Sequence, residues 1–356
     1  MQRLRFITLN LWAQHGLWPL RAAAIQAELL VQAPAVVALQ EVLGFGGGKT
    51  QLDELCARLP PELYPHRAYA PACALPGDRT FGNALLSRFP IAAQRNVALP
   101  NPRRREPRVL LCALLALPVG QLPVFVTHLD WELDASPARC QQVRFIAEQI
   151  DDFIATAPRL ASAASPGGAH PGGAPAEVLP AILAGDFNAE PQSDEIRFLT
   201  GHHGLAGPDG QAPRGVYFSD CYTRALVVED KCPDDHPSAP GATFARRNPF
   251  AARAGEPDRR LDYIFAALPD AHGRCQPLRS FRCFREPHPA GESLATAALR
   301  DGAKDDHGNK DGIAPGSTSD SGPDTRTAGN DATGCGGKSN LVWASDHYGV
   351  AVDFAI

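Results

Sequence analysis

The 356-residue sequence lacks the features that mark membrane-spanning and nucleic-acid-binding proteins. It contains no apolar run long enough to cross a bilayer, and its first residues, MQRLRFITLN, lack the apolar core of a signal peptide. The formal net charge is only −5, without the pervasive basic excess that is usual in proteins that bind duplex nucleic acid. We therefore expect a cytoplasmic protein without a transmembrane segment, for which nucleic acid is an open but not a favoured partner.

The sequence also lacks paired cysteines. It has nine Cys, an odd number, and no C-x-x-C motif. Disulfide frameworks and zinc sites usually need regularly spaced or paired cysteines, so this distribution favours reduced thiols. Because 44% of the residues are hydrophobic, the chain can bury a sizeable core.

Strand-like and helix-like segments alternate along the chain. Four short apolar runs are typical of strands: residues 5–9, 35–39, 109–117 and 179–184. Two longer segments have the apolar spacing of helices: residues 19–32 and 138–155. A further short helix is predicted with Ser193 as its N-cap and Gly201 as its stop. This alternation predicts an α/β or α+β fold.

Two stretches do not have the composition of a packed core. Residues 158–176 are rich in Ala, Gly, Pro and Ser, and residues 286–340 have few large aliphatic side chains. Segments of this kind bury too little apolar surface to offset the entropy lost on ordering. Apolar sequence resumes at Leu341, so we predict one domain over residues 1–356 with low-complexity insertions at about 158–176 and 286–340.

Polar residues follow or end several of the apolar runs. In LAGDFNAEP, Asp186 and Asn188 stand two apart, and residues two apart on a strand face the same side. They would then face one cleft, although an Asx-type turn is an alternative interpretation. The same pattern recurs at Asn10, at Glu41, at His128 with Asp130, at Asp262, and at Asp346 with His347. Carboxylates, His and Asn without clustered Cys predict a site for an oxygen-ligated metal and a phosphate.

The ordered set of these motifs resembles the endonuclease/exonuclease/phosphatase superfamily of metal-dependent phosphohydrolases. The matching pieces are Asn10 in TLNLW, Glu41 in LQEV, Asn83 in GNALLSRFPI, His128 in THL, Asp186 and Asn188 in GDFN, Thr243 in ATF, Asp262 in RLDYIF, and Asp346 with His347 in SDH. The resemblance implies a four-layer α/β sandwich of two mostly antiparallel sheets flanked by helices. Its active site would lie at one end, between the sheets.

The resemblance also implies Mg²⁺-dependent hydrolysis of a phosphate ester, with Mn²⁺ as an alternative cation. The implied metal ligands are Glu41, Asn10 and Asp346. The implied catalytic residues are Asp186 and His347, which activate water, Asp262, which orients His347, and His128 and Asn188, which donate to the phosphate. The expected substrate-binding residues are Asn83, Thr243 and Arg105, the last from a basic cluster at 103–105 for which a solvated loop is the alternative.

One departure from the pattern bears on the substrate. Members that repair abasic DNA tend to carry an acidic residue two after the first Asn, and here that position is Trp12. We therefore expect a monomeric phosphodiesterase acting on a small-molecule or lipid-derived ester. The alternatives are an endonuclease or exonuclease on DNA or RNA, and a catalytically silent binding module. The last is disfavoured because each motif position holds a residue competent for the chemistry.

Overall fold

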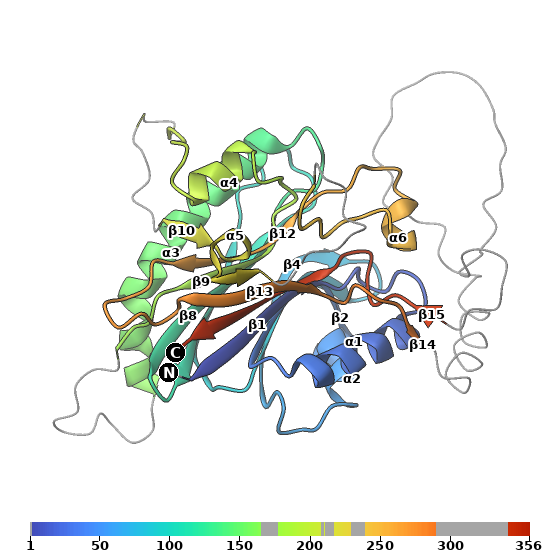
Figure 1. Cartoon of the computed structure of the whole chain (residues 1–356), viewed down its shortest axis with the longest axis horizontal. Helices are drawn as coiled ribbons and strands as arrows, with labels where there is room; N and C mark the ends of the chain where they lie inside the picture. Colours follow the sequence, from blue (N-terminus) through green and yellow to red (C-terminus); the bar gives the residue numbers. More distant parts are fainter. Residues whose placement is uncertain (1, 165–176, 208–209, 211–216, 229–238, 290–340) are drawn as a thin grey trace.

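Two β-sheets packed face to face form the centre of the computed structural model, which describes residues 2–164, 177–207, 210, 217–228, 239–289 and 341–356 (Figure 1). The first sheet contains, in spatial order, β11 (Val227–Val228), β13 (Pro277–Cys283), β16 (Gly349–Ala355), β1 (Arg3–Asn10), β2 (Val36–Phe45), β5 (Arg79–Ser87) and β4 (His66–Leu75), with β3 (Lys49–Thr50) paired to β2. The second contains β10 (Phe218–Asp220), β12 (Asp262–Ala267), β9 (Ile182–Asp186), β8 (Gly120–His128), β7 (Val109–Leu117) and β6 (Ile91–Ala98).

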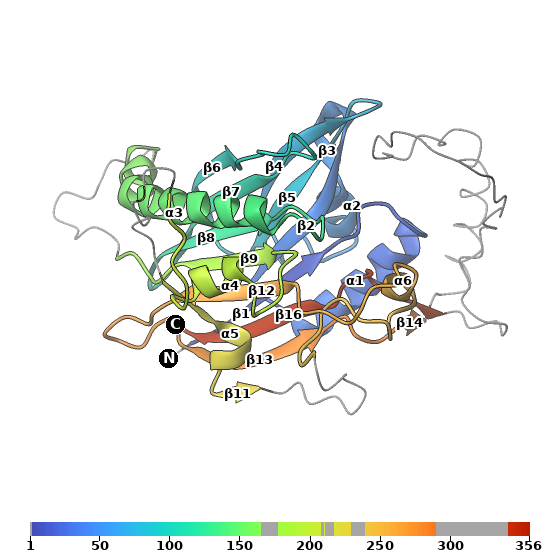
Figure 2. The ribbon, with the colours of Figure 1, turned by 90° about the horizontal axis from the view of Figure 1, so that it is seen from above.

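Helices cover the outer faces of the two sheets (Figures 1 and 2). The first sheet packs on α1 (Trp18–Gln32) and α2 (Gln51–Cys56), and the second packs on α3 (Ser136–Ala164) and α4 (Asp194–Leu199). Strand β1 shows how the layers arise: Leu4 and Phe6 pack between the sheets, whereas Ile7 and Leu9 pack with the helices. This two-residue alternation buries both faces. The predicted four-layer α/β sandwich is confirmed.

Antiparallel pairing dominates both sheets, as predicted. The parallel pairs are β1 with β2, β8 with β9, and β11 with β13. The first and last strands of the described chain, β1 and β16, are antiparallel neighbours in the middle of the first sheet. The loop that leads into β16 therefore ends beside β1, and this brings the SDH motif next to Asn10.

The longest helix differs from its prediction. Helix α3 runs from Ser136 to Ala164, whereas apolar spacing predicts only residues 138–155. It thus enters the segment predicted as the first insertion, because a stretch rich in Ala favours the helix even without an apolar face. The rest of that insertion, residues 165–176, lies outside the described residues.

The second predicted insertion is bounded by a short strand pair. Strand β14 (His288–Pro289) is antiparallel to β15 (Leu341–Val342), so the chain on either side of residues 290–340 is joined. Those residues lie outside the described part of the chain, and the organisation as a single domain stays a prediction. Two further short helices, α5 (Cys221–Arg224) and α6 (Pro249–Ala252), and a 3₁₀ turn at Gly46–Gly48 complete the described elements.

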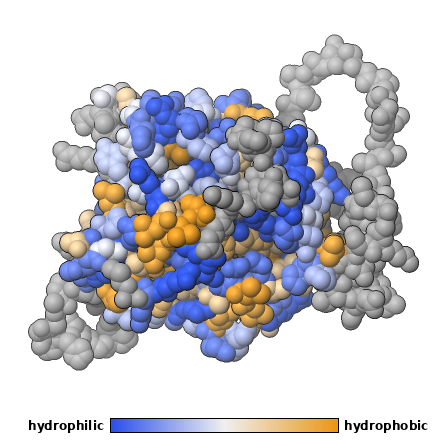
Figure 3. Space-filling model, viewed as in Figure 1, coloured by the Kyte–Doolittle hydropathy of each residue, from blue (hydrophilic) through white to orange (hydrophobic). Residues whose placement is uncertain are grey.

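The structure also bears on the sequence predictions about membranes and thiols. Among the described residues, no helix combines the length and apolarity needed to span a bilayer. Six cysteines of the described residues are free thiols: Cys56, Cys73, Cys112, Cys140, Cys221 and Cys275. Figure 3 shows one face of the molecule, which is largely hydrophilic but carries apolar patches. The edge strand β11 lies on this side, and its Val227 and Val228 are exposed, as is the neighbouring Leu226.

Asn83 joins the two sheets. It lies in β5 of the first sheet, is buried, and donates from Nδ2 to the carbonyl of Val109 at the start of β7 in the second sheet, at 2.9 Å. Its predicted substrate-binding role stays a prediction.

Replacing Asn83 by Leu should destabilise the protein by about 1–3 kcal/mol, because the buried carbonyl of Val109 loses a donor. Urea unfolding followed by circular dichroism measures this change, with Gln94→Leu on the exposed edge strand β6 as the control. A variant of unchanged stability that has lost its activity would instead support the substrate-binding role predicted from the sequence.

Candidate active site

Three polar residues lie side by side at one end of the second sheet: the last residues of β8 and β9 and the first residue of β12. His128 of β8 stands opposite Asp186 of β9, and Asp186 stands opposite Asp262 of β12. All three side chains are buried. On β9 the preceding residues of the same face, Ile182 and Ala184, pack between the sheets, so strand alternation directs Asp186 into the end of the inter-sheet layer.

The glycine before Asp186 has a steric reason. Gly185 has a φ of +152°, and a Cβ there would collide with the carbonyl of Thr127 in β8. Only glycine tolerates both this conformation and this close backbone approach. Gly185 therefore allows the parallel pairing that sets Asp186 beside His128.

Asn10, at the end of β1, connects the first sheet to this row. Its Nδ2 donates to Asp186 Oδ2 at 3.0 Å and to Glu41 Oε1 at 3.1 Å. Its Oδ1 accepts from the backbone N–H of Trp12 at 2.9 Å, and its own carbonyl accepts from the hydroxyl of Ser345 at 2.6 Å. The structure thus brings Asn10, Glu41 and Asp186 together, as the sequence predicts.

Glu41 sits at an irregularity in β2. The pairing of β2 with β5 shifts register between Leu39 and Val42, and Glu41 has a φ of +54°. A bulge of this kind re-aims a side chain out of the regular alternation. Burial, and after it the nearby carboxylate of Asp346, raise the pKa of Glu41 to about 7. Burial also raises the pKa of Asp346.

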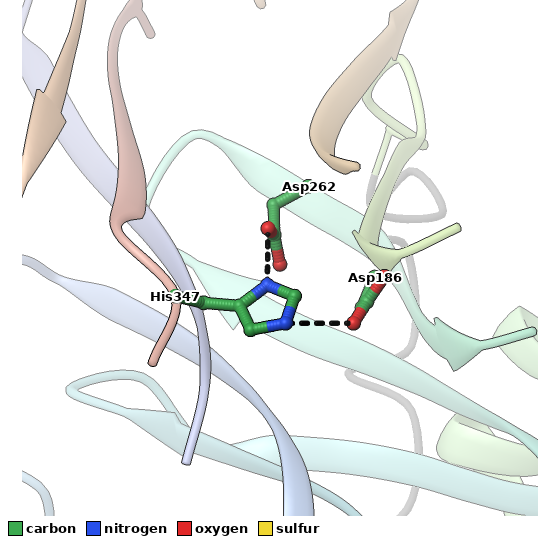
Figure 4. A group of neighbouring side chains, drawn as sticks. All are labelled: Asp186, Asp262 and His347. Carbon is green, nitrogen blue, oxygen red and sulfur yellow. Dashed lines mark hydrogen bonds and ion pairs between the residues drawn. The ribbon is translucent and has the colours of Figure 1, made fainter. Parts of the chain in front are cut away.

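His347 lies between two carboxylates of the second sheet (Figure 4). Its Nδ1 is 2.8 Å from Asp262 Oδ2, and its Nε2 is 3.7 Å from Asp186 Oδ2. Burial lowers the pKa of His347, but Asp262, Asp186 and Asp346 outweigh burial and raise the pKa well above its usual value. Burial likewise acts to raise the pKa of Asp186, yet His347 and His128 together lower it. Burial raises the pKa of Asp262 to about 6 although His347 acts to lower it, so we expect an imidazolium between ionised carboxylates at pH 7.

His128 is electrically different from His347. Burial lowers the pKa of His128 to about 3, and the nearby Arg108 guanidinium acts in the same direction. Arg108 Nη1 is 3.0 Å from His128 Nδ1. Because a guanidinium can only donate, Nδ1 must accept and Nε2 carries the proton, 3.7 Å from Asp186 Oδ2. His128 is therefore a neutral donor.

Arg108 is a site residue that the sequence reasoning missed. Its side chain is buried and lies within 3.0 Å of both His128 and Glu106. The predicted Arg105 is instead half-exposed and lies 3.6 Å from Glu132 on the surface. The signal that separates them is position: Arg108 directly precedes the apolar strand β7, whereas Arg105 stands three residues further out in the loop.

Thr243 is also placed differently from its prediction. It is fully buried, and its hydroxyl oxygen accepts from the backbone N–H groups of Leu261 and Asp262 at 3.0 and 3.1 Å. The carbonyl of Thr243 accepts from the N–H of Tyr348, next to His347. Thr243 therefore fixes the Asp262–His347 pair from both sides and has no exposed surface for a substrate.

The strand-period argument for Asn188 is wrong. Strand β9 ends at Asp186, and Asn188 follows in a turn with a left-handed backbone, φ +49°. The N–H of Asn188 donates to Asp186 Oδ1 at 2.9 Å, and its Nδ2 donates to the carbonyl of Leu129 at 3.2 Å. This is the Asx turn that the sequence left as an alternative. Strand β8 likewise ends at His128, so the same period does not carry Asp130 into the site.

Two groups of donor atoms compete as a cation site. Asp186, Asp262 and His347 offer ligand atoms within 4.8 Å of one another, but these three residues already form ion pairs among themselves. Glu41, Asp346 and the amide oxygen of Asn10 offer only oxygen, the preference of Mg²⁺. Both carboxylates are half-buried, and desolvation raises the pKa of each. This second group fits a hard divalent cation.

Fold and site together define a class: a four-layer α/β sandwich with a buried carboxylate and histidine group between its sheets. The chain belongs to the endonuclease/exonuclease/phosphatase family, whose model matches residues 7–347. Members of this family are phosphoester hydrolases and generally depend on divalent metal ions. No curated protein matches the chain in sequence.

Solved structures with the same fold are distant in sequence. An endonuclease/exonuclease/phosphatase from Beutenbergia cavernae has 21% identity and a TM-score of 0.52, over 100% of this chain and 72% of that one. TDP2 from C. elegans has 14% identity and a TM-score of 0.55, over 99% and 75%. An endonuclease/exonuclease/phosphatase from Bacteroides vulgatus has 15% identity and a TM-score of 0.57, over 100% of both chains. These likenesses show the fold.

The two histidines should titrate far apart in the metal-free protein. We expect His347 to be protonated at about pH 7 and His128 to remain neutral down to about pH 5, as read by ¹⁵N NMR of the imidazole nitrogens. Because its folded pKa is raised, His347 stabilises the fold fully below about pH 6.5, and this contribution is lost as pH rises through the folded pKa. A neutral His347 at pH 7 would contradict this charge assignment.

Arg108 and Arg105 provide a matched test of which arginine belongs to the site. Arg108→Gln should lower kcat/KM for a p-nitrophenyl phosphoester about 100-fold, because it removes the guanidinium that keeps the Nε2 proton of His128 available to stabilise developing charge. Arg105→Gln should change it less than about twofold, because exposed ion pairs contribute little. Arg108→Lys controls for folding and should retain part of the activity. Equal effects of the two Gln variants would overturn the distinction.

Proposed function

We propose that the protein is a Mg²⁺-dependent phosphodiesterase acting on a small-molecule or lipid-derived ester. The observation that carries this proposal is that Glu41 and Asp346, two half-buried carboxylates of raised pKa, lie beside the His128–Asp186–Asp262 row. A cation bound by Glu41, Asp346 and Asn10 would neutralise charge on the phosphate oxygens, and Mn²⁺ has the same ligand preference.

Asp186 is the proposed acceptor of the proton from the attacking water. Its pKa lies below the usual value, so the carboxylate is ionised, and Asn10 and the N–H of Asn188 hold both of its oxygens in place. General-base help of this kind is typically worth about 10²- to 10⁴-fold. His347 is a weaker candidate for this role, because its imidazole already carries a proton.

The remaining side chains stabilise charge on the phosphate. His347, oriented by Asp262, would donate from Nε2 as an imidazolium, and neutral His128 would donate from its own Nε2. Arg108 holds the His128 ring in that tautomer and adds positive charge next to it. In this proposal Asn188 keeps Asp186 in place through the turn.

Surface charge supports a small substrate over a nucleic acid. In the run of three Arg at 103–105, Arg103 pairs with Glu132 and Asp134, and Arg105 with Glu132. Cations that are already paired contribute less to the counterion release that drives nucleic-acid binding. Since the described site is built from one chain, we also propose a monomer. The free thiols of Cys56, Cys112 and Cys221 support the proposed cytoplasmic location.

Hydrolysis of bis-p-nitrophenyl phosphate and of p-nitrophenyl phosphate, with Mg²⁺, Mn²⁺ or EDTA, tests this function. We expect metal-dependent turnover with a preference for the diester, abolished by EDTA and reduced at least about 100-fold in Asp186→Asn. Asp152→Asn, on the exposed face of α3, is the matched control and should retain full activity. A monoester preference would make the protein a phosphatase. Turnover that is independent of metal and of Asp186 would contradict the proposal.

A further inference from the structure

Three aromatic side chains gather at the rim of the site. The ring centroid of Trp12 is 5.3 Å from that of His15 and 4.8 Å from that of Phe250, with interplanar angles of 37° and 34°. His15 is exposed, and Trp12 and Phe250 are partly exposed. The cluster therefore presents aromatic surface to solvent, where burial alone gives it little stability.

The cluster is held in an unfavourable backbone conformation. Trp12 and Ala13 both have positive φ, +56° and +44°. For residues other than glycine the left-handed region costs roughly 1–2 kcal/mol each. Such outliers persist only where the surroundings enforce them, and they concentrate at functional sites.

Arg21 enforces this conformation. Its buried guanidinium donates to the carbonyls of Leu11 and Ala13 at 2.7 Å, of His15 at 2.8 Å and of Trp12 at 3.3 Å. A further bond, to the carbonyl of Ala344 at 2.9 Å, ties the same loop to the segment that carries Asp346. The aromatic loop is thus fixed relative to the proposed cation ligands.

Phe250 is fixed to the same place from another segment. Asn248 caps α6 by accepting from the N–H of Phe250, and its Nδ2 donates to the carbonyl of Ser345 at 2.7 Å. On the other side, the N–H of Trp12 donates to Asn10 Oδ1. The surroundings of the His15 ring partly desolvate it and lower its pKa, and Asp346 is near enough to act against this shift. All three rings therefore adjoin the Asn10 and Asp346 side of the site.

We propose that Trp12, His15 and Phe250 form a subsite that stacks on a flat, unsaturated ring in the alcohol part of the substrate. This inference rests on the proposed phosphodiesterase function and narrows its substrate class. Aromatic faces suit a planar ring because offset stacking adds to simple burial. A cationic head group is disfavoured, because the Arg21 guanidinium already lies 5.3 Å from the centroid of the Trp12 ring.

Three diesters with the same p-nitrophenolate leaving group test the subsite: the phenyl, cyclohexyl and choline esters of p-nitrophenyl phosphate. Phenyl and cyclohexyl have similar size but differ in planarity. We expect Trp12→Leu and Phe250→Leu to lower the phenyl-to-cyclohexyl ratio of kcat/KM about fivefold relative to wild type. Trp12→Phe, which keeps a ring, should retain most of the ratio. Tyr217→Leu removes an exposed ring elsewhere and should leave the ratio unchanged.

The outcomes separate the subsite from the function on which it rests. If the wild type hydrolyses none of the three esters with Mg²⁺ or Mn²⁺, the proposed function fails, and the subsite fails with it. If the esters are hydrolysed but the Leu variants affect phenyl and cyclohexyl equally, only the subsite is overturned. A wild-type preference for choline that is lost in the Leu variants would mean that the rings bind a cation, which also overturns it.

Discussion

The amide of Asn10 is the contact on which the site depends. One side-chain nitrogen at the end of β1 donates both to Glu41 in its own sheet and to Asp186 in the opposite sheet. Its two oxygens fix the Trp12 loop and the Ser345 turn. A neutral donor is needed here, because an acidic residue would add a carboxylate between two others and a cation would compete with the metal. The inter-sheet geometry of the whole centre follows from this small group.

Around Asn10 the site divides into two halves of different charge. Burial raises the pKa of both Glu41 and Asp346, and Asp346 acts further to raise that of Glu41. Asp186 and Asp262 instead share a protonated His347. Enzymes commonly assign different roles to titratable groups whose surroundings shift their pKa values in opposite directions. In our account the first half binds the cation, and the second accepts the proton of the attacking water and donates hydrogen bonds to the phosphate.

The sequence predicts much of this, for identifiable reasons. Strand β7 has the predicted bounds, 109–117, because its apolar run is unbroken. The polar row is predictable because each of its residues adjoins an apolar run: His128 and Asp186 end β8 and β9, and Asp262 begins β12. Asn188 could not be placed this way, since it depends on where β9 stops. The sequence does not show which Arg of this loop is buried, so Arg108 could not be distinguished from Arg105. Thr243 could not be placed because it acts only through backbone contacts with residues distant in sequence.

The most direct test of the account is the position of the cation. Crystals grown with Mn²⁺ and inorganic phosphate, measured at the manganese edge, should show an anomalous peak at coordination distance from the carboxylate of Glu41, with Asn10 and Asp346 beside it and the phosphate facing His128 and His347. A peak centred instead on Asp186, Asp262 and His347 would contradict the division of the site into a cation half and a proton half.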